Sequence, residues 1–143
     1  MNKRRAKITS VGHYVPDNVL TNAKLEEMVE TDDEWIRSRT GIAERRILDD
    51  SDLATSHMAT ETAKEVLEKR GIDAGEIDLI LLATVTPDYL FPATSCIVQK
   101  NIGADNAFAY DILAACSGFL YALTTAAVYI EAGRADKVLV LGA

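Results

Sequence analysis

The residue best suited to carry out chemistry is Cys116, in the segment Asp111-Ile-Leu-Ala-Ala-Cys116-Ser-Gly-Phe119. A strand predicted over residues 107–112 leads into this segment, and a long apolar helix predicted over 117–132 leads out of it. The free N–H groups and the positive dipole end of a helix N-terminus stabilise an anion, so such a corner favours a thiolate. Cys116 is therefore the candidate nucleophile.

Four other residues are weaker candidates. Cys96 falls in a short predicted helix without a charged neighbour, which is typical of a small buried side chain. His13 and His57 could be proposed as bases for Cys116, but structural or solvated positions are the simpler interpretation. We interpret Asp111 as a strand-end residue that anchors the corner through hydrogen bonds, rather than as a catalytic acid.

A cluster of arginines could bind a small phosphorylated ligand. Guanidinium groups make paired, charge-assisted hydrogen bonds to phosphate, and four of them fall in one short span: Arg37, Arg39, Arg45 and Arg46. The alternative is that they only solvate the surface. The net charge of −7 argues against general binding of nucleic acid, which needs a basic footprint.

An α/β fold must position these residues, because strand and helix patterns alternate along most of the chain. Residues 77–85 form a nearly unbroken apolar run, which is typical of a strand buried on both faces of a parallel sheet. The helix over 117–132 is apolar or small on almost every side, which predicts burial all round. Further strands are expected over 7–12, 42–48 and 137–141, and further helices over 21–29, 31–40, 51–70 and 94–102.

Composition sets the broad class. The chain has 143 residues, of which 48% are hydrophobic, and this suits a globular domain or a piece of a larger one. No apolar stretch is long enough to span a membrane, and the N-terminus does not read as a signal peptide. Two cysteines make neither a disulfide framework nor a metal site, so a reduced, cytoplasmic setting is the simplest interpretation.

Several motifs occur in a specific order. They are Gly12-His-Tyr-Val-Pro16, Thr31-Asp-Asp-Glu-Trp35, Arg39-Thr-Gly-Ile-Ala-Glu-Arg-Arg46, Thr84-Val-Thr-Pro-Asp88, Phe91-Pro92 and the Cys116 segment. With this order and spacing, residues 6–143 resemble the N-terminal half of β-ketoacyl-acyl-carrier-protein synthase III, an acyltransferase with the thiolase fold. The resemblance implies a mixed, mostly parallel five-stranded sheet with helices on both faces, as one of two layers of an αβαβα sandwich.

The resemblance also implies an activity. Cys116 would take the acyl group of an acyl-CoA, with acetyl-CoA expected, and its backbone N–H would help to form the oxyanion hole. Decarboxylative condensation with malonyl-acyl-carrier-protein would follow and would initiate fatty-acid synthesis. No cofactor is implied, since acyl-CoA is a substrate, and the enzyme is expected to be a cytoplasmic homodimer.

Five further residues receive roles from the same resemblance. Trp35 would stack on the adenine of coenzyme A, and Thr31 would belong to the same pocket. Arg39 and Thr40 would contact the nucleotide end. Phe91 would reach across the dimer interface to line the acyl pocket of the partner. The alternative for Trp35 is an aromatic that anchors its helix in the core, and the alternative for Phe91 is an ordinary interface or core aromatic.

The family also uses a His and an Asn, for which nothing in this chain matches. We therefore expect residues 1–143 to be an N-terminal half-domain, with the C-terminal half supplied from elsewhere, for example by a separate chain. Two kinds of function remain as alternatives. One is another thiolase-fold condensing enzyme, similar to 3-hydroxy-3-methylglutaryl-CoA synthase or to a secondary-metabolite ketosynthase, and the other is a non-catalytic half-domain.

Overall fold

The computed structural model describes residues 4–143, and the chain divides into two compact units. One unit, which we call the sheet unit, contains residues 4–14 and 54–143, and the other, the small unit, contains residues 15–53. Each unit is described by itself.

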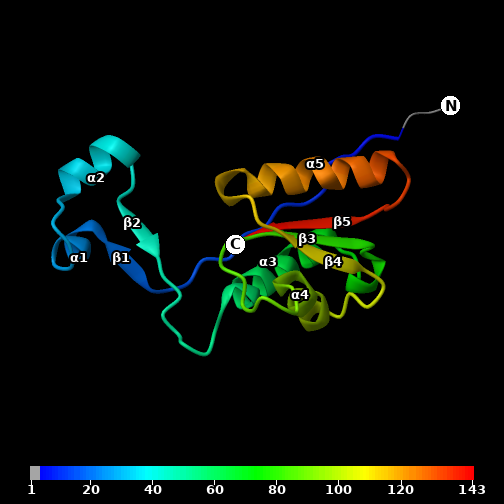
Figure 1. Ribbon diagram of the computed structural model, residues 1–143, viewed down its shortest axis with the longest axis horizontal. Coiled ribbons are helices and arrows are strands. Elements are labelled where there is room, and N and C mark those ends of the chain that lie inside the picture. The colour runs from blue at the N-terminus through cyan, green and yellow to red at the C-terminus, as the bar shows by residue number, and fades with distance from the viewer. Residues whose placement is uncertain (1–3) are drawn as a thin grey trace. The chain divides into compact units, whose positions relative to one another are not determined.

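A parallel sheet of three strands forms the centre of the sheet unit (Figure 1). The middle strand is β3 (Leu79–Ala83), which pairs on one side with β4 (Phe108–Ile112) and on the other with β5 (Val138–Gly142). All five residues of β3 are buried. This confirms the prediction that the apolar run in this region is a strand buried on both faces, as expected for a parallel sheet between helices.

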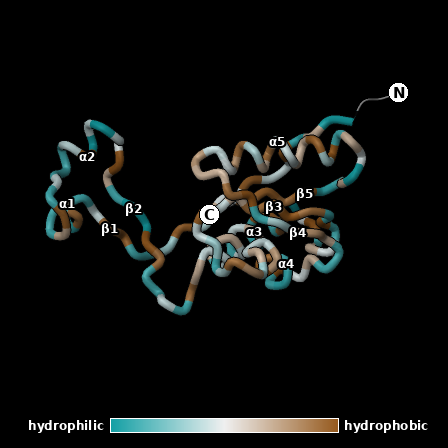
Figure 2. The backbone as a smooth tube through the Cα atoms, in the orientation of Figure 1, coloured by the Kyte–Doolittle hydropathy of each residue, from teal (hydrophilic) through white to brown (hydrophobic). Residues whose placement is uncertain are grey.

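Helices cover both faces of this sheet (Figure 1). The helices α3 (Thr55–Arg70) and α4 (Thr94–Ile102) lie on one face, and α5 (Gly118–Glu131) lies on the other. Side chains of β3 alternate between the two faces, and the hydropathy colouring in Figure 2 shows this strand as strongly apolar. The predicted α/β class and the placement of helices on both faces are confirmed.

Glycines end the helices where the sequence indicates. Gly71 after α3 and Gly103 after α4 both adopt the left-handed conformation, with φ of 68° and 75°, which glycine reaches without steric cost. A short 3-10 helix, η1 (Ala74–Glu76), follows α3, and a second, η2 (Ala115–Ser117), precedes α5. The predicted bounds of α4 agree with the structure, whereas α3 begins four residues later than expected.

The small unit pairs two short strands with two short helices. The strands β1 (Val19–Thr21) and β2 (Glu44–Arg46) run antiparallel, and between them lie α1 (Asn22–Glu26) and α2 (Asp33–Thr40). The side chain of Thr21 caps α1 by accepting the Lys24 amide. The side chain of Asp32 caps α2, because it accepts the Trp35 amide at 2.6 Å.

Two expectations about the sheet are wrong. Within residues 4–143 the strands form a three-stranded and a two-stranded sheet instead of one five-stranded sheet. No strand forms over residues 7–12, where Ile8 and Val11 are 68% and 71% exposed. This segment instead contacts α3, where the Ser10 hydroxyl donates to the Val66 carbonyl at 3.2 Å. The β-branched residues of this segment favour an extended chain, but they do not identify a pairing partner.

The expected burial of α5 is only half correct. Ala122 and Ala126 are buried against the sheet, while Leu120 and Val128 are 63% and 60% exposed. Among the described residues a single sheet covers a single face of this helix. No helix within residues 4–143 has both the length and the apolar character needed to cross a bilayer.

Candidate functional site

Cys116 lies at the carboxyl edge of the sheet. It belongs to the turn η2, which joins the end of β4 to the start of α5, and its thiol is free and exposed. A Cβ placed on Gly118 would be 3.2 Å from the Cβ of Ala83, the last residue of β3. The head of α5 therefore packs tightly against the strand ends, which is where α/β proteins commonly bind ligands.

The residue before Cys116 has a strained backbone. Ala115 has a φ of 45°, and it is the only non-glycine residue with positive φ in the described part of the chain. An alanine in the left-handed region costs about 1–2 kcal/mol. Such strain persists only where surrounding structure enforces it, and it is concentrated at functional sites. The sequence did not reveal this feature, because alanine carries no signal for positive φ.

The backbone N–H groups at η2 determine whether this turn can stabilise an anion. The Ser117 amide donates to the Ala114 carbonyl at 3.1 Å, and the Gly118 amide donates to the Ala115 carbonyl. No hydrogen bond from the Cys116 amide is found among residues 4–143. Within the described residues that N–H therefore has no acceptor, and it is available to an anion at the head of α5.

The weaker candidates have structural surroundings. The ring of His57 packs edge-on against Tyr14 at 5.5 Å, and the backbone N–H of His13 donates to Glu65 at 2.5 Å. Within residues 4–143 no hydrogen bond joins either histidine to Cys116. The Cys96 thiol is half-buried and donates weakly to the Ala109 carbonyl at 3.7 Å.

Asp111 anchors the corner, in agreement with its interpretation from the sequence. Its two carboxylate oxygens accept the amides of Thr94 and Ser95, each at 2.8 Å, at the start of α4. Both of those residues are fully buried. This carboxylate therefore ties the end of β4 to α4.

Phe91 lies in a loop whose ends are held by hydrogen bonds and whose tip is exposed. At the base, Asp88 accepts the Ser56 amide at 2.9 Å and donates its own amide to the Thr94 hydroxyl at 2.9 Å. At the tip, Leu90 and Phe91 are 102% and 89% exposed. Phe91 is therefore not a core aromatic of the sheet unit.

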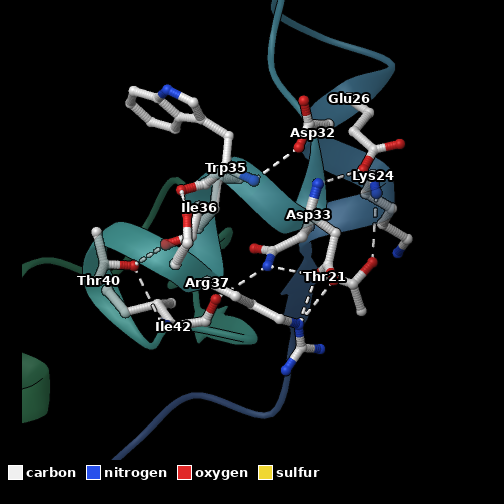
Figure 3. A network of polar contacts seen from close by, with 12 residues as sticks. Thr21, Lys24, Glu26, Asp32, Asp33, Trp35, Ile36, Arg37, Thr40 and Ile42 are labelled. Carbon is white, nitrogen blue, oxygen red and sulfur yellow. Dashed lines mark hydrogen bonds and ion pairs between the residues drawn. The ribbon is translucent and has the colours of Figure 1, made fainter.

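The nucleotide-binding candidates belong to the small unit. Trp35 is 54% exposed, so it is not a core aromatic, and the guanidinium of Arg39 lies 5.0 Å from the centre of its ring. The indole in Figure 3 points away from the polar contacts around Asp33 and Arg37. A flat indole beside a cation forms a surface on which a base can stack.

Three of the four clustered arginines are committed to structural contacts. Arg37 pairs with Asp33 at 2.7 Å, Arg45 donates to the Asn22 side chain at 2.8 Å, and Arg46 donates to the Pro16 carbonyl at 3.1 Å. Among residues 4–143, the side chain of Arg39 makes neither an ion pair nor a hydrogen bond. Of this cluster, Arg39 is the guanidinium best placed to meet a ligand.

Thr31 and Thr40 have different environments. Thr31 lines an open pocket of about 250 Å³ together with Glu30, Asp32 and Trp35. The Thr40 hydroxyl is engaged within the protein, since it donates to the Ile36 carbonyl at 2.7 Å and accepts the Ile42 amide at 3.1 Å (Figure 3). Thr31 and Trp35 are thus brought together, while the hydroxyl of Thr40 stabilises the end of α2.

A polar network that the sequence did not indicate holds α2. Its centre is Asn22, which is 2% exposed and makes side-chain hydrogen bonds to Asp33, Ile42 and Arg45. The hydrogen bonds from Arg37 and then from Asn22 hold the pKa of Asp33 below its ordinary value. The sequence signal was only an asparagine beside a helix cap, which usually marks a local turn.

Comparison with known proteins connects these features to one family. A sequence model described as 3-oxoacyl-[acyl-carrier-protein (ACP)] synthase III matches residues 110–143, the segment that contains Cys116. A protein of Chlorobium phaeovibrioides named β-ketoacyl-[acyl-carrier-protein] synthase III is 57% identical over 138 residues, which are 96% of this chain and 42% of that protein. The chain thus spans less than half the length of the curated relatives it matches.

Solved structures give the same result. The crystal structure of 3-oxoacyl-[acyl-carrier-protein] synthase III from Aquifex aeolicus matches with a TM-score of 0.91 and 51% identity, over 96% of this chain and 44% of that one. The priming β-ketosynthase of a polyketide biosynthetic pathway matches with a TM-score of 0.87 and 35% identity, over 94% and 40%. In sequence and in fold, the chain therefore matches the N-terminal half of the β-ketoacyl-acyl-carrier-protein synthase III family.

Proposed function

We propose that the chain carries the acyl-accepting cysteine and the coenzyme A nucleotide site of a β-ketoacyl-acyl-carrier-protein synthase III. The observation that carries this proposal is the exposed thiol of Cys116 at the head of α5, within the segment that the family model matches. Coenzyme A takes part as a substrate, and the chemistry requires no cofactor.

The first half-reaction uses residues of this chain. The Cys116 thiolate attacks the carbonyl carbon of an acyl-CoA, with acetyl-CoA as the expected donor. The free amide of Cys116 stabilises the oxyanion of the tetrahedral intermediate. The bond between the carbonyl carbon and the coenzyme A sulfur then breaks, and coenzyme A leaves as a thiolate that takes up a proton. The acyl group remains on Cys116 as a thioester.

The second half-reaction forms a carbon–carbon bond. Malonyl-acyl-carrier-protein loses carbon dioxide, and the electron pair of the broken bond stays on the carrier-bound fragment as an enolate. The enolate attacks the acyl carbonyl on Cys116, and the sulfur of Cys116 leaves as a thiolate. The products are a β-ketoacyl-carrier protein and carbon dioxide. The His and Asn that the family resemblance assigns to this step match no residue of this chain.

The nucleotide end of coenzyme A is assigned to the small unit. Stacking of adenine on Trp35, beside Thr31, is supported by the exposure of the indole and by the adjacent pocket. A phosphate contact from Arg39 is supported by its lack of a carboxylate partner within residues 4–143. The backbone of Thr40 remains a candidate contact, while its hydroxyl is used to end α2.

We further propose that the protein forms a homodimer, in the cytoplasmic setting expected from its two cysteines. The support for the homodimer is the loop tip at Leu90 and Phe91, where large apolar side chains are almost wholly exposed. In this arrangement Phe91 reaches the acyl pocket of the partner, so substitution of Phe91 is expected to change both dimerisation and acyl preference.

Mass spectrometry of the full natural protein after incubation with acetyl-CoA tests the first half-reaction. We expect a mass increase of one acetyl group on the peptide that contains Cys116. Cys116→Ser should abolish this thioester adduct, and Cys96→Ala, the matched control at the other thiol, should retain it. An adduct that survives Cys116→Ser, or no adduct in the unsubstituted protein, would count against an enzyme and in favour of a non-catalytic module.

Product analysis separates the related condensing enzymes. With labelled acetyl-CoA and malonyl-carrier protein, we expect a labelled β-ketoacyl-carrier protein. The higher identity to the Aquifex synthase than to the polyketide ketosynthase supports the fatty-acid assignment. Condensation with acetoacetyl-CoA instead of malonyl-carrier protein would replace the proposal by a 3-hydroxy-3-methylglutaryl-CoA synthase.

A further inference from the structure

Asn22 is a buried amide whose two N–H donors and whose oxygen all have protein partners. Its Nδ2 donates to the Asp33 carboxylate at 2.7 Å and to the Ile42 carbonyl at 2.9 Å, and its Oδ1 accepts from Arg45 at 2.8 Å. The side chain is 2% exposed, so water cannot replace these partners. Two acceptors face the NH₂ group and a cation faces the oxygen, so the orientation of the amide is defined.

The partners of Asn22 lie at both ends of one helix. Asp33 is the first residue of α2, and Ile42 is the second residue after its last one, Thr40. Arg45 belongs to β2 and lies opposite Leu20 of β1. A single side chain therefore joins the beginning and the end of α2 to the two-stranded sheet. A helix of eight residues has little stability alone, so contacts of this kind decide where it lies.

The helix that Asn22 holds carries the proposed nucleotide contacts. Trp35 and Arg39 lie on α2 and both are exposed, so packing against a core does not fix either side chain directly. The Trp35 backbone is fixed at the head of the helix, where its amide donates to Asp32 at 2.6 Å. The position of the indole and of the guanidinium thus depends on the position of the whole helix.

We propose that Asn22 is a positioning residue for the nucleotide end of the acyl-CoA substrate, acting by fixing both ends of the helix that presents Trp35 and Arg39. The inference rests on the proposed function above. Asn22 itself is buried and touches no substrate. Its loss therefore weakens binding of the nucleotide and leaves the chemistry at Cys116 unchanged.

The test uses Asn22→Asp in the full natural protein. This substitution keeps the shape of the side chain but replaces the NH₂ donor by an oxygen, which sets two carboxylates against each other at the head of α2. Asn18→Asp is the matched control, since it makes the same chemical change at an exposed side chain of the same unit. N22D/D33N is the rescue variant, because it restores the hydrogen bond to the head of α2 with donor and acceptor exchanged.

Two acyl donors distinguish a role of Asn22 in positioning the nucleotide contacts from a general loss of structure in the variant. Acetyl-CoA carries the nucleotide, and the acetyl thioester of N-acetylcysteamine does not. For Asn22→Asp we expect the KM for acetyl-CoA to rise about tenfold or more with kcat unchanged, because misplacement of binding groups by ~1 Å has effects of this size. Acylation of Cys116 by the nucleotide-free thioester should not change. The rescue variant should recover part of the KM, and Asn18→Asp should behave as the unsubstituted protein does.

Hydrogen exchange of residues 33–40 completes the experiment, and we expect α2 to remain protected in Asn22→Asp. Three results would overturn the inference while leaving the proposed function intact: an unchanged KM for acetyl-CoA, an equal loss of rate with both thioesters, or loss of protection throughout α2. If the unsubstituted protein is acylated by neither thioester, the proposed function fails and the inference fails with it.

Discussion

Replacement of Asp111 tests how the corner before Cys116 is held. Asp111→Asn preserves the shape of the side chain and one carbonyl oxygen, so one of the two amides at the head of α4 keeps its acceptor. The other amide then faces an NH₂ group instead of a carboxylate oxygen. Asp111→Ala removes both acceptors. The residues that donate, Thr94 and Ser95, are fully buried, so water has poor access to their amides.

The size of the effect follows from these two bonds. A hydrogen bond to a charged group contributes about 1.5–3 kcal/mol to stability, and a buried amide left without a partner costs a similar amount. Loss of one such bond in Asp111→Asn should therefore lower the free energy of unfolding by about 1.5–3 kcal/mol. Loss of both in Asp111→Ala should lower it by about 3–5 kcal/mol.

Urea unfolding of the full natural protein, followed by far-ultraviolet circular dichroism, measures these free energies. Hydrogen exchange at the amides of Thr94 and Ser95 measures the local effect, and both amides should exchange faster in the variants. Asp105→Asn is the control, because Asp105 is exposed and its substitution should change stability by less than about 0.5 kcal/mol. The reasoning is refuted if Asp111→Ala resembles Asp105→Asn, or if the amides of Thr94 and Ser95 stay protected.

Three further predictions concern single side chains. Ala115→Gly should raise the free energy of unfolding by about 0.5–1 kcal/mol, since relief of about 1–2 kcal/mol of left-handed strain exceeds the entropy gained by the unfolded chain; a loss of stability in urea would contradict the assigned φ. Gly118→Val should destabilise by about 1–3 kcal/mol, because the added carbons press on the last residue of β3; an unchanged urea midpoint would show that the contact is loose. The pKa of Asp33 is lower in the folded chain than in the unfolded chain. The ionised Asp33 carboxylate therefore stabilises the fold fully at any pH above the ordinary aspartate pKa, and this stabilisation is lost as the pH falls through the pKa of Asp33 in the folded chain. Fluorescence of Trp35 during acid titration should report this loss, and Asp33→Asn should remove it; an identical acid transition in that variant would argue against the assignment.

Local sequence signals predicted the sheet unit well. A run of apolar residues specifies a strand buried on both faces, and a glycine after a periodic apolar segment specifies where a helix ends, so β3 and α4 were correct. The segment over 7–12 shows the limit of such signals. Ile8, Thr9 and Val11 are β-branched residues that favour an extended chain, yet pairing depends on which edge the chain meets, and residue types do not contain that information.

The candidate site was predictable only where a residue type carries the chemistry. Cys116 was found because a thiol between a strand and a helix has few other uses, and the structure places it in that turn. The strain at Ala115 and the buried network of Asn22 were missed, since alanine and asparagine have many ordinary roles. Their importance here comes from tertiary contacts that no short spacing encodes.

The strand at the middle of the sheet also has a consequence for synthesis of the protein. β3 is paired on both sides by strands that lie later in the chain, with register partners 29 residues away in β4 and 59 residues away in β5. At ribosomal rates of about 5–20 residues per second, synthesis of the chain between β3 and β5 takes roughly 3–12 s, and the second edge of β3 has no partner during that time. During that interval an apolar strand with an open edge is available to other chains. We expect nascent chains stopped before β5 to depend on chaperones, and this dependence to fall once β5 has emerged from the ribosome.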